Sequence, residues 1–105
     1  MEVRRGDIIL VPLDPVVGSE VGKTRPCMVV SPPEMNRHAS AVIIVPLTTG
    51  NRPYPWRVDC EVDNVSGQAM LDQIRTVSKD RIVKWLQPAP PSLTGSVLDL
   101  SLIHI

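Results

Sequence analysis

Eleven prolines are spread along a chain of 105 residues, and they restrict the chain to short secondary-structure elements. Proline has no backbone N–H to donate and clashes with the preceding helical turn. It therefore interrupts helices and is confined to strand ends, edges and bulges. The prolines separate short apolar runs, such as residues 8–11 and 41–45, which are rich in β-branched residues. Such runs favour strands. We therefore expect a mainly β protein.

The individual elements follow from the pattern of apolar residues. Several short runs are continuously apolar, as expected of strands buried on both faces, whereas residues 56–62 alternate with period two, as in a half-buried strand. Leucine and valine recur at helical spacing after the prolines at 88–91, which predicts a C-terminal helix. The expected strands are residues 7–13, 27–31, 41–45, 56–62, 68–77 with a kink near 72–73, and 81–86, with a helical turn at 34–37 and a chain turn at Ser66-Gly67.

Six or seven short strands followed by one helix predict a small, strongly bent antiparallel barrel. A length of 105 residues predicts one domain, residues 1–105. The core is expected to be aliphatic, because phenylalanine is absent and Tyr54, Trp56 and Trp85 are the three aromatic residues.

The charge balance is neutral as a whole but uneven along the chain. Eleven basic and eleven acidic residues give no overall indication of a nucleic-acid partner. Residues 35–58, however, contain no carboxylate and include Arg37, His38, Arg52 and Arg57. A basic sector of this kind can attract phosphate. A loop region that happens to lack acidic residues would look the same, and both readings remain open.

The cysteines and histidines do not indicate a metal site or a disulfide. Cys27 and Cys60 each lie in an apolar, strand-like run, which favours buried free thiols. The two histidines, His38 and His104, are far apart in the sequence, and no cofactor is expected. The first residues do not resemble a signal peptide, and no apolar run is long enough to span a membrane. The sequence predicts a cytoplasmic protein.

One connection is longer than a turn requires. Residues 18–26 read GSEVGKTRP and join the first two expected strands. A simple hairpin needs two to five residues, and long loops on a rigid scaffold are common places for binding and catalysis. This loop carries Glu20, Lys23 and Arg25, with two hydroxyl groups. It is a candidate functional loop, although Arg25 could instead pair with Glu20 or Asp14 at the surface.

A set of short motifs occurs in order along nearly the whole chain. The pieces are Arg5-Gly6-Asp7, Gly18-Ser19-Glu20, Arg25-Pro26, Val29-Val30-Ser31, Asn36-Arg37, Pro46-Leu47-Thr48-Thr49, Tyr54-Pro55 and Asp72-Gln73-Ile74-Arg75-Thr76. No piece is specific by itself, but the ordered combination resembles the MazF/PemK (Kid) family of toxin endoribonucleases.

The resemblance implies an SH3-like antiparallel barrel with a C-terminal helix, which forms a homodimer and cuts single-stranded RNA without metal. It also implies a cognate antitoxin protein that neutralises the activity. By similarity, Arg25 and Thr48 would be the catalytic pair, with Glu20 nearby in the same loop. The residues expected to contact RNA are Ser19, Lys23, Thr49, Arg52, Tyr54, Asp72 and Gln73.

The residue types suit this chemistry. When a ribose 2′-hydroxyl attacks its own phosphodiester, the protein mainly has to stabilise added negative charge, and the planar arginine fork does so at any working pH. A threonine hydroxyl can donate to a phosphate oxygen. Arginine is a poor general base, so Glu20 and Asp72 are the candidates for that role. Some relatives carry a basic residue where this chain has Met70, which removes one possible second cation.

Two other readings remain. A CcdB-like toxin that binds gyrase would share the fold, but residues 101–105 lack the C-terminal motif of that family. An SH3-like interaction module would need an aromatic groove, for which three aromatics are few. Tyr54 and Trp56, flanked by Arg52 and Arg57, could form a base-stacking face or cover the barrel rim, and for Trp56 the sequence favours a core position.

Overall fold

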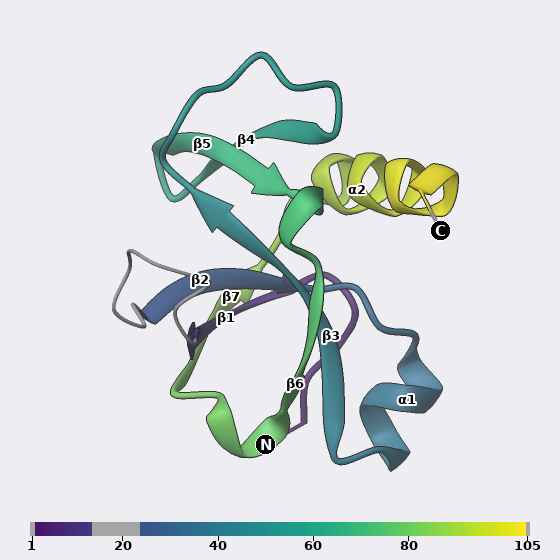
Figure 1. Cartoon of the computed structure of the whole chain (residues 1–105). Helices are drawn as coiled ribbons and strands as arrows, with labels where there is room; N and C mark the ends of the chain where they lie inside the picture. The colour runs from purple at the N-terminus through teal and green to yellow at the C-terminus, as the bar shows by residue number, and fades with distance from the viewer. Residues whose placement is uncertain (1, 14–23, 105) are drawn as a thin grey trace.

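Seven strands and a C-terminal helix make up most of the chain in this computed structural model, which describes residues 2–13 and 24–104 (Figure 1). The strands are β1 (Asp7–Pro12), β2 (Thr24–Val29), β3 (Ala41–Thr48), β4 (Arg57–Val62), β5 (Val65–Met70), β6 (Arg75–Ser78) and β7 (Lys84–Pro88). The helices are α1 (Pro33–His38), α2 (Pro91–His104) and the 3₁₀ turns η1 (Leu71–Gln73) and η2 (Lys79–Arg81). None of the helices in these described ranges is long and apolar enough to cross a membrane.

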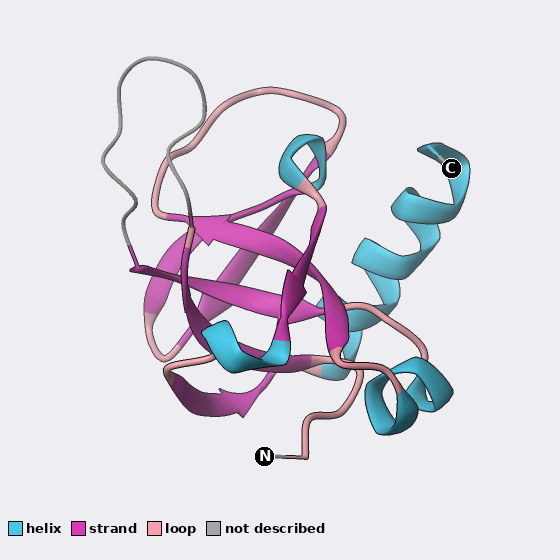
Figure 2. Cartoon of the chain, turned by 60° about the horizontal axis from the view of Figure 1, so that its bottom comes forward, coloured by secondary structure: helices cyan, strands magenta, loops and turns pink. Residues whose placement is uncertain are grey.

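The strands form one curled antiparallel sheet in the order β4-β5-β3-β2-β1-β7, with β6 added beside β3. The long strand β3 pairs with β2 along one side. Along its other side it pairs first with β6 and then with β5. Figure 2 shows the sheet curling round with the helices outside it. The prediction of a small, bent, SH3-like antiparallel barrel with a C-terminal helix is confirmed.

Apolar side chains cover both faces of the central strands. One buried cluster contains Ile9, Cys27, Val29 and Ile44. A second cluster lies on the other face, where Leu93 and Val97 of α2 pack against β1, β2, β3 and β5. Burial on both faces explains why the sequences of β1 and β3 are continuously apolar rather than alternating. In β4 the alternation survives, because Val58, Cys60 and Val62 are half-buried while Asp59 and Glu61 are exposed.

The expected kink near Asp72-Gln73 is confirmed. The chain leaves β5, makes the single 3₁₀ turn η1 and returns to β3 as β6. The turn lets two consecutive strands share one side of the long strand β3. It also places residues 72–73 between β5 and β6, which follow each other along β3.

Three expected boundaries were wrong. The hairpin between β4 and β5 turns at Asp63 and Asn64, both with positive φ (53° and 65°), rather than at Ser66-Gly67, which lies inside β5. Two positive φ values are typical of type I′ turns, and Asp and Asn tolerate them. The last strand begins at Lys84 rather than 81, because residues 79–81 form η2. Strand β2 begins at Thr24, so Arg25 belongs to a strand rather than to a loop.

Three of the motif pieces contain residues with structural roles. Gly6 adopts a φ of 93°, a conformation that favours glycine. Its N–H donates to the carbonyl of Val29, and its carbonyl accepts from the N–H of Ala89, each at 2.7 Å. Ser31 and Asn36 are buried at 1% and 3% exposure and hydrogen-bond to each other. Asn36 Nδ2 also donates to the carbonyl of Ser31 at 2.9 Å, which ties α1 to the sheet. These pieces of the motif set therefore maintain the fold.

Candidate active site

A hollow of about 640 Å³ opens where β2 begins and β3 ends. Residues 24–26 of β2 and 47–48 of β3 line it, together with Thr49 and residues of β4, β5 and β7. Arg25 and Thr48, the two residues expected to act together, therefore border the same hollow within one chain. Thr49, expected to contact RNA, lines it as well.

The hollow has a cause in the sequence. Strands β2 and β3 pair from Val29/Ile44 to Cys27/Pro46, and the ladder stops there. Pro26 and Pro46 have no N–H to donate, so the ladder cannot continue in the usual way. Carried two residues further, the same register would set Arg25 opposite Thr48. Opposite residues of antiparallel strands point to the same face.

The Thr48 hydroxyl has a defined orientation. Its oxygen accepts a hydrogen bond from the N–H of Gly50 at 3.2 Å. The side chain is half-buried, and the bond uses an acceptor lone pair rather than the hydroxyl hydrogen. A threonine held in this way can donate its own hydrogen to a ligand oxygen in the hollow.

Gln68 secures the loop that follows Thr48. This side chain in β5 is 3% exposed. Its Nε2 donates to the carbonyl of Arg52 at 2.7 Å and to Asp59 Oδ1 at 3.0 Å, and its Oε1 accepts from the N–H of Arg52 at 2.9 Å. A buried amide satisfied by the backbone fixes the position of that backbone. The backbone at Arg52, in the middle of this loop, is therefore held from inside the protein.

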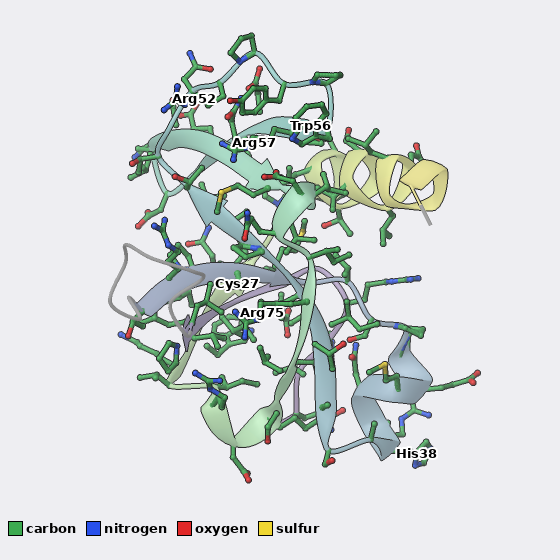
Figure 3. The ribbon with its side chains drawn as sticks, viewed as in Figure 1. Cys27, His38, Arg52, Trp56, Arg57 and Arg75 are labelled. Atoms are coloured by element: carbon green, nitrogen blue, oxygen red, sulfur yellow. The ribbon has the colours of Figure 1, made fainter. Side chains whose placement is uncertain are left out.

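The far end of the same loop carries an aromatic pair. The rings of Tyr54 and Trp56 are stacked, with centroids 5.0 Å apart and planes 13° from parallel. The guanidinium of Arg57 lies over Tyr54, 5.1 Å from the ring centroid. Figure 3 shows Arg52, Trp56 and Arg57 together on the lobe formed by this loop, β4 and β5. The expectation of a core position for Trp56 is wrong, because 38% of it is exposed.

Asp72 holds Arg57 in place. Its two carboxylate oxygens accept from Arg57 Nε and Nη2, each at 3.2 Å. Partial burial raises the pKa of Asp72, but hydrogen bonds from Arg57 and from nearby groups, with the Arg57 charge, outweigh it and leave the pKa below its usual value. Asp72 is therefore ionised and engaged at neutral pH. Arg57 is also the cross-strand partner of Met70, so a cation lies opposite that position after all.

Cys27 is a buried thiol that experiences the charges of Arg25 and Arg75. Burial raises the pKa of the Cys27 thiol to about 12, although the charges of Arg25 and Arg75 both act to lower it. Figure 3 shows Arg75 beside Cys27, where β6 meets the barrel. Arg75 of β6 lies opposite Ile44 of β3 in the sheet, and Ile44 lies opposite Val29 of β2. The charges of two arginines therefore act on one buried, neutral side chain.

We expect Cys27 to resist alkylation while the protein is folded. The thiolate is the reactive form, and a thiol with a pKa of about 12 stays protonated at pH 8. Burial and the Asp59 charge also raise the pKa of Cys60, but this thiol is partly exposed and lines the hollow. Iodoacetamide at pH 8 should therefore modify Cys60 and should spare the fully buried Cys27 until urea unfolds the chain. Mass spectrometry of peptides measures both sites. A Cys60→Ser variant should show almost no labelling when native, and rapid native labelling of Cys27 would contradict the expectation.

Of the remaining predicted site residues, five lie in the described part of the chain and three lie outside it. Gln73 and Asp72 lie in η1 at the surface, and Arg52, Tyr54 and Thr49 lie in or next to the loop above the hollow. Glu20, Ser19 and Lys23 lie outside the described residues.

Within residues 2–13 and 24–104 no group of three histidine, cysteine, aspartate or glutamate side chains is placed to hold a metal ion. Sequence reasoning assigned no role to Gln68, although a glutamine inside the apolar run of β5 was a signal for it.

The fold and the hollow define a class: a small curled barrel with an arginine and a threonine at the ends of neighbouring strands. Residues 4–99 match the profile of the PemK-like, MazF-like toxins of type II toxin–antitoxin systems. The chain belongs to this family, as its motifs predicted.

Individual relatives agree with the family assignment. The endoribonuclease toxin MazF of Escherichia coli K12 is 36% identical over 73 residues, which are 70% of this chain and 66% of that protein. The crystal structure of MazF from Deinococcus radiodurans aligns with a TM-score of 0.82 and 26% identity, covering 100% of this chain and 99% of that one. An endoribonuclease of a mycobacterial species, solved with its cognate antitoxin, aligns with a TM-score of 0.76 and 26% identity over 97% and 92% of the two chains. These relatives favour the endoribonuclease reading over the gyrase-binding and SH3-module alternatives.

Proposed function

We propose that this chain is a sequence-specific, metal-independent endoribonuclease toxin that cleaves single-stranded RNA in the cytoplasm. The observation that carries the proposal is the hollow shared by Arg25 and Thr48. Residues 1–105 would act as one domain. The endoribonuclease names of the relatives and the family profile support the activity.

The proposed reaction needs no external nucleophile. The ribose 2′-oxygen forms a bond to the adjacent phosphorus, the bond from phosphorus to the 5′-oxygen breaks, and the 5′-oxygen takes up a proton. Arg25 neutralises the charge that builds on the phosphate oxygens, and Thr48 donates its hydroxyl hydrogen to one of them. A proton must leave the 2′-oxygen. Because Asp72 is engaged with Arg57, Glu20 is the better candidate for the base.

RNA would lie across the loop above the hollow. Thr49, Arg52, Tyr54 and Gln73 are the described residues proposed to contact it, and Ser19 and Lys23 would add contacts from the segment outside the described residues. The chain is proposed to form a homodimer and to be neutralised by a cognate antitoxin. The antitoxin complex of the mycobacterial relative supports that partner.

A long single-stranded transcript incubated with the purified protein in EDTA tests the proposal. We expect cuts at a short repeated sequence, leaving a 2′,3′-cyclic or 3′-phosphate on one side and a 5′-hydroxyl on the other, because the 2′-oxygen is the nucleophile. Mapping of the cut ends measures both the sequence and the chemistry. Products with 5′-phosphates, or cutting that requires added Mg²⁺, would contradict it. A gyrase supercoiling assay checks the non-enzymatic alternative.

A further inference from the structure

All three aromatic side chains of this chain are exposed. Tyr54, Trp56 and Trp85 have exposed fractions of 39%, 38% and 43%, while the buried core is aliphatic. An aromatic ring has a large apolar surface that normally favours burial, and exposed apolar patches commonly mark interaction sites. The position of Tyr54 and Trp56 is therefore not explained by the stability of the core.

The Tyr54–Trp56 pair is fixed in place rather than loosely exposed. The rings stack on each other, Arg57 lies against Tyr54, and Asp72 binds Arg57 through two hydrogen bonds. Gln68 holds the same loop at Arg52 through two backbone hydrogen bonds. A preorganised surface loses little conformational entropy when a ligand binds.

The chemistry of the pair and its surroundings suits a nucleobase. Flat rings with an exposed surface stack on bases of any sequence, and nearby guanidinium groups attract the phosphates that connect the bases. Arg52 and Arg57 flank the rings in sequence, and residues 49–58 contain no carboxylate. Asp72 balances the charge of Arg57, so Arg52 supplies the remaining positive charge of this loop, which favours a polyanion over a cationic partner.

We propose that the stacked side chains of Tyr54 and Trp56 form a platform on which one unpaired base of the RNA stacks. Arg57, which Asp72 holds in position, supports this platform through its contact with Tyr54. The inference rests on the proposed function, because it takes single-stranded nucleic acid as the ligand. It assigns Trp56 a direct contact and makes Asp72 a positioning residue that acts through Arg57. The platform would hold the strand beside the hollow that contains Arg25.

Binding of oligonucleotides that cannot be cleaved tests the platform separately from the chemistry. The probes are a seven-nucleotide single-stranded DNA of adenine, which lacks the 2′-hydroxyl, and an abasic backbone of the same length. Fluorescence anisotropy gives the dissociation constant of each. Wild-type protein should bind the adenine probe about ten times or more tightly than the abasic one, as one base stacked on an aromatic side chain implies.

Trp56→Ala should lose most of this preference for bases while keeping its affinity for the abasic backbone. Trp56→Phe, which retains a ring, should restore much of the preference. Trp85→Ala is the matched control, because Trp85 is equally exposed but lies on β7, at the opposite end of the strand order. It should bind both probes like the wild type.

Three results would overturn the platform: no preference for bases in the wild type, an unchanged preference in Trp56→Ala, or an equal loss in Trp85→Ala. A platform that binds a protein segment instead would give the first or the second of these. Failure of the proposed function is distinguishable, since it appears as an uncut transcript in EDTA whether or not the DNA probe binds through Trp56. A transcript that is cut, combined with base-independent binding, would remove the platform and leave the nuclease.

Discussion

Replacing Arg25 with alanine is expected to lower RNA cleavage by at least about a hundredfold, because it removes a charged donor that acts on the transition state. Arg25 lies in β2 and borders the hollow, and it is half-buried without belonging to either apolar cluster. The fold should therefore survive the substitution. Initial rates on a single-site RNA measure the effect, and thermal unfolding followed by circular dichroism reports whether the barrel remains.

Two further variants test whether the loss of cleavage is specific to the guanidinium group at position 25. Arg25→Lys keeps the positive charge but lacks the planar fork, so it should recover only part of the lost rate. Arg37→Ala removes an exposed arginine on α1, which lies at the opposite end of β3 from the hollow, and should cut RNA at nearly the wild-type rate (Figure 1). An Arg25→Ala protein that is folded and fully active would remove Arg25 from the mechanism.

Gly67→Ala is expected to destabilise the protein by about 3 kcal/mol, because the new methyl group would overlap with the backbone of β3. A Cβ at Gly67 would lie 2.0 Å from the carbonyl oxygen of Thr48 and 3.3 Å from the Cα of Thr49. Backbone atoms cannot rotate away as a flexible side chain can, so β3 or β5 must shift. In a domain of this size the melting temperature should fall by more than about 10 °C.

The same shift should impair cleavage, because Thr48 lies at the point of overlap. Gly50→Ala is the matched control, since a Cβ there would meet Thr48 at 3.6 Å, an ordinary contact distance. That variant should melt within a few degrees of the wild type. A Gly67→Ala protein with unchanged melting temperature and activity would show that the two strands separate more easily than their packing indicates.

Much of the barrel was predictable because its strands are short and their burial is recorded in the pattern of residues. The continuous apolar runs of β1 and β3 and the alternation of β4 identify strands and the number of faces they bury. The turn at Asp63-Asn64 was missed because Ser66-Gly67 looks like the stronger local signal. Gly67 has a different purpose: it allows β5 to approach β3 at Thr48. Local turn preference and close packing both select glycine, and the sequence does not distinguish them.

The candidate site was partly predictable for a related reason. Ordered motifs identified Arg25 and Thr48, but they do not contain the buried Gln68 that holds Arg52, nor the contacts that join Asp72 to Arg57 and Arg57 to Tyr54. The first two of these contacts connect positions 15 or more residues apart, and the third depends on the path of the loop that carries Tyr54. Trp56 was assigned to the core by its residue type, and its observed exposure depends on how the loop is secured.

By itself, the sequence determined the mainly β character, the aliphatic core, the C-terminal helix and the family. These follow from the positions of its prolines, from the spacing of its apolar residues and from a set of ordered motifs. The tertiary structure decided that Arg25 and Thr48 border one hollow and that the aromatic pair faces outward. The reason is that strand pairing, curling of the sheet and the end of the β2–β3 ladder at Pro46 set the distances between residues that are remote in the chain.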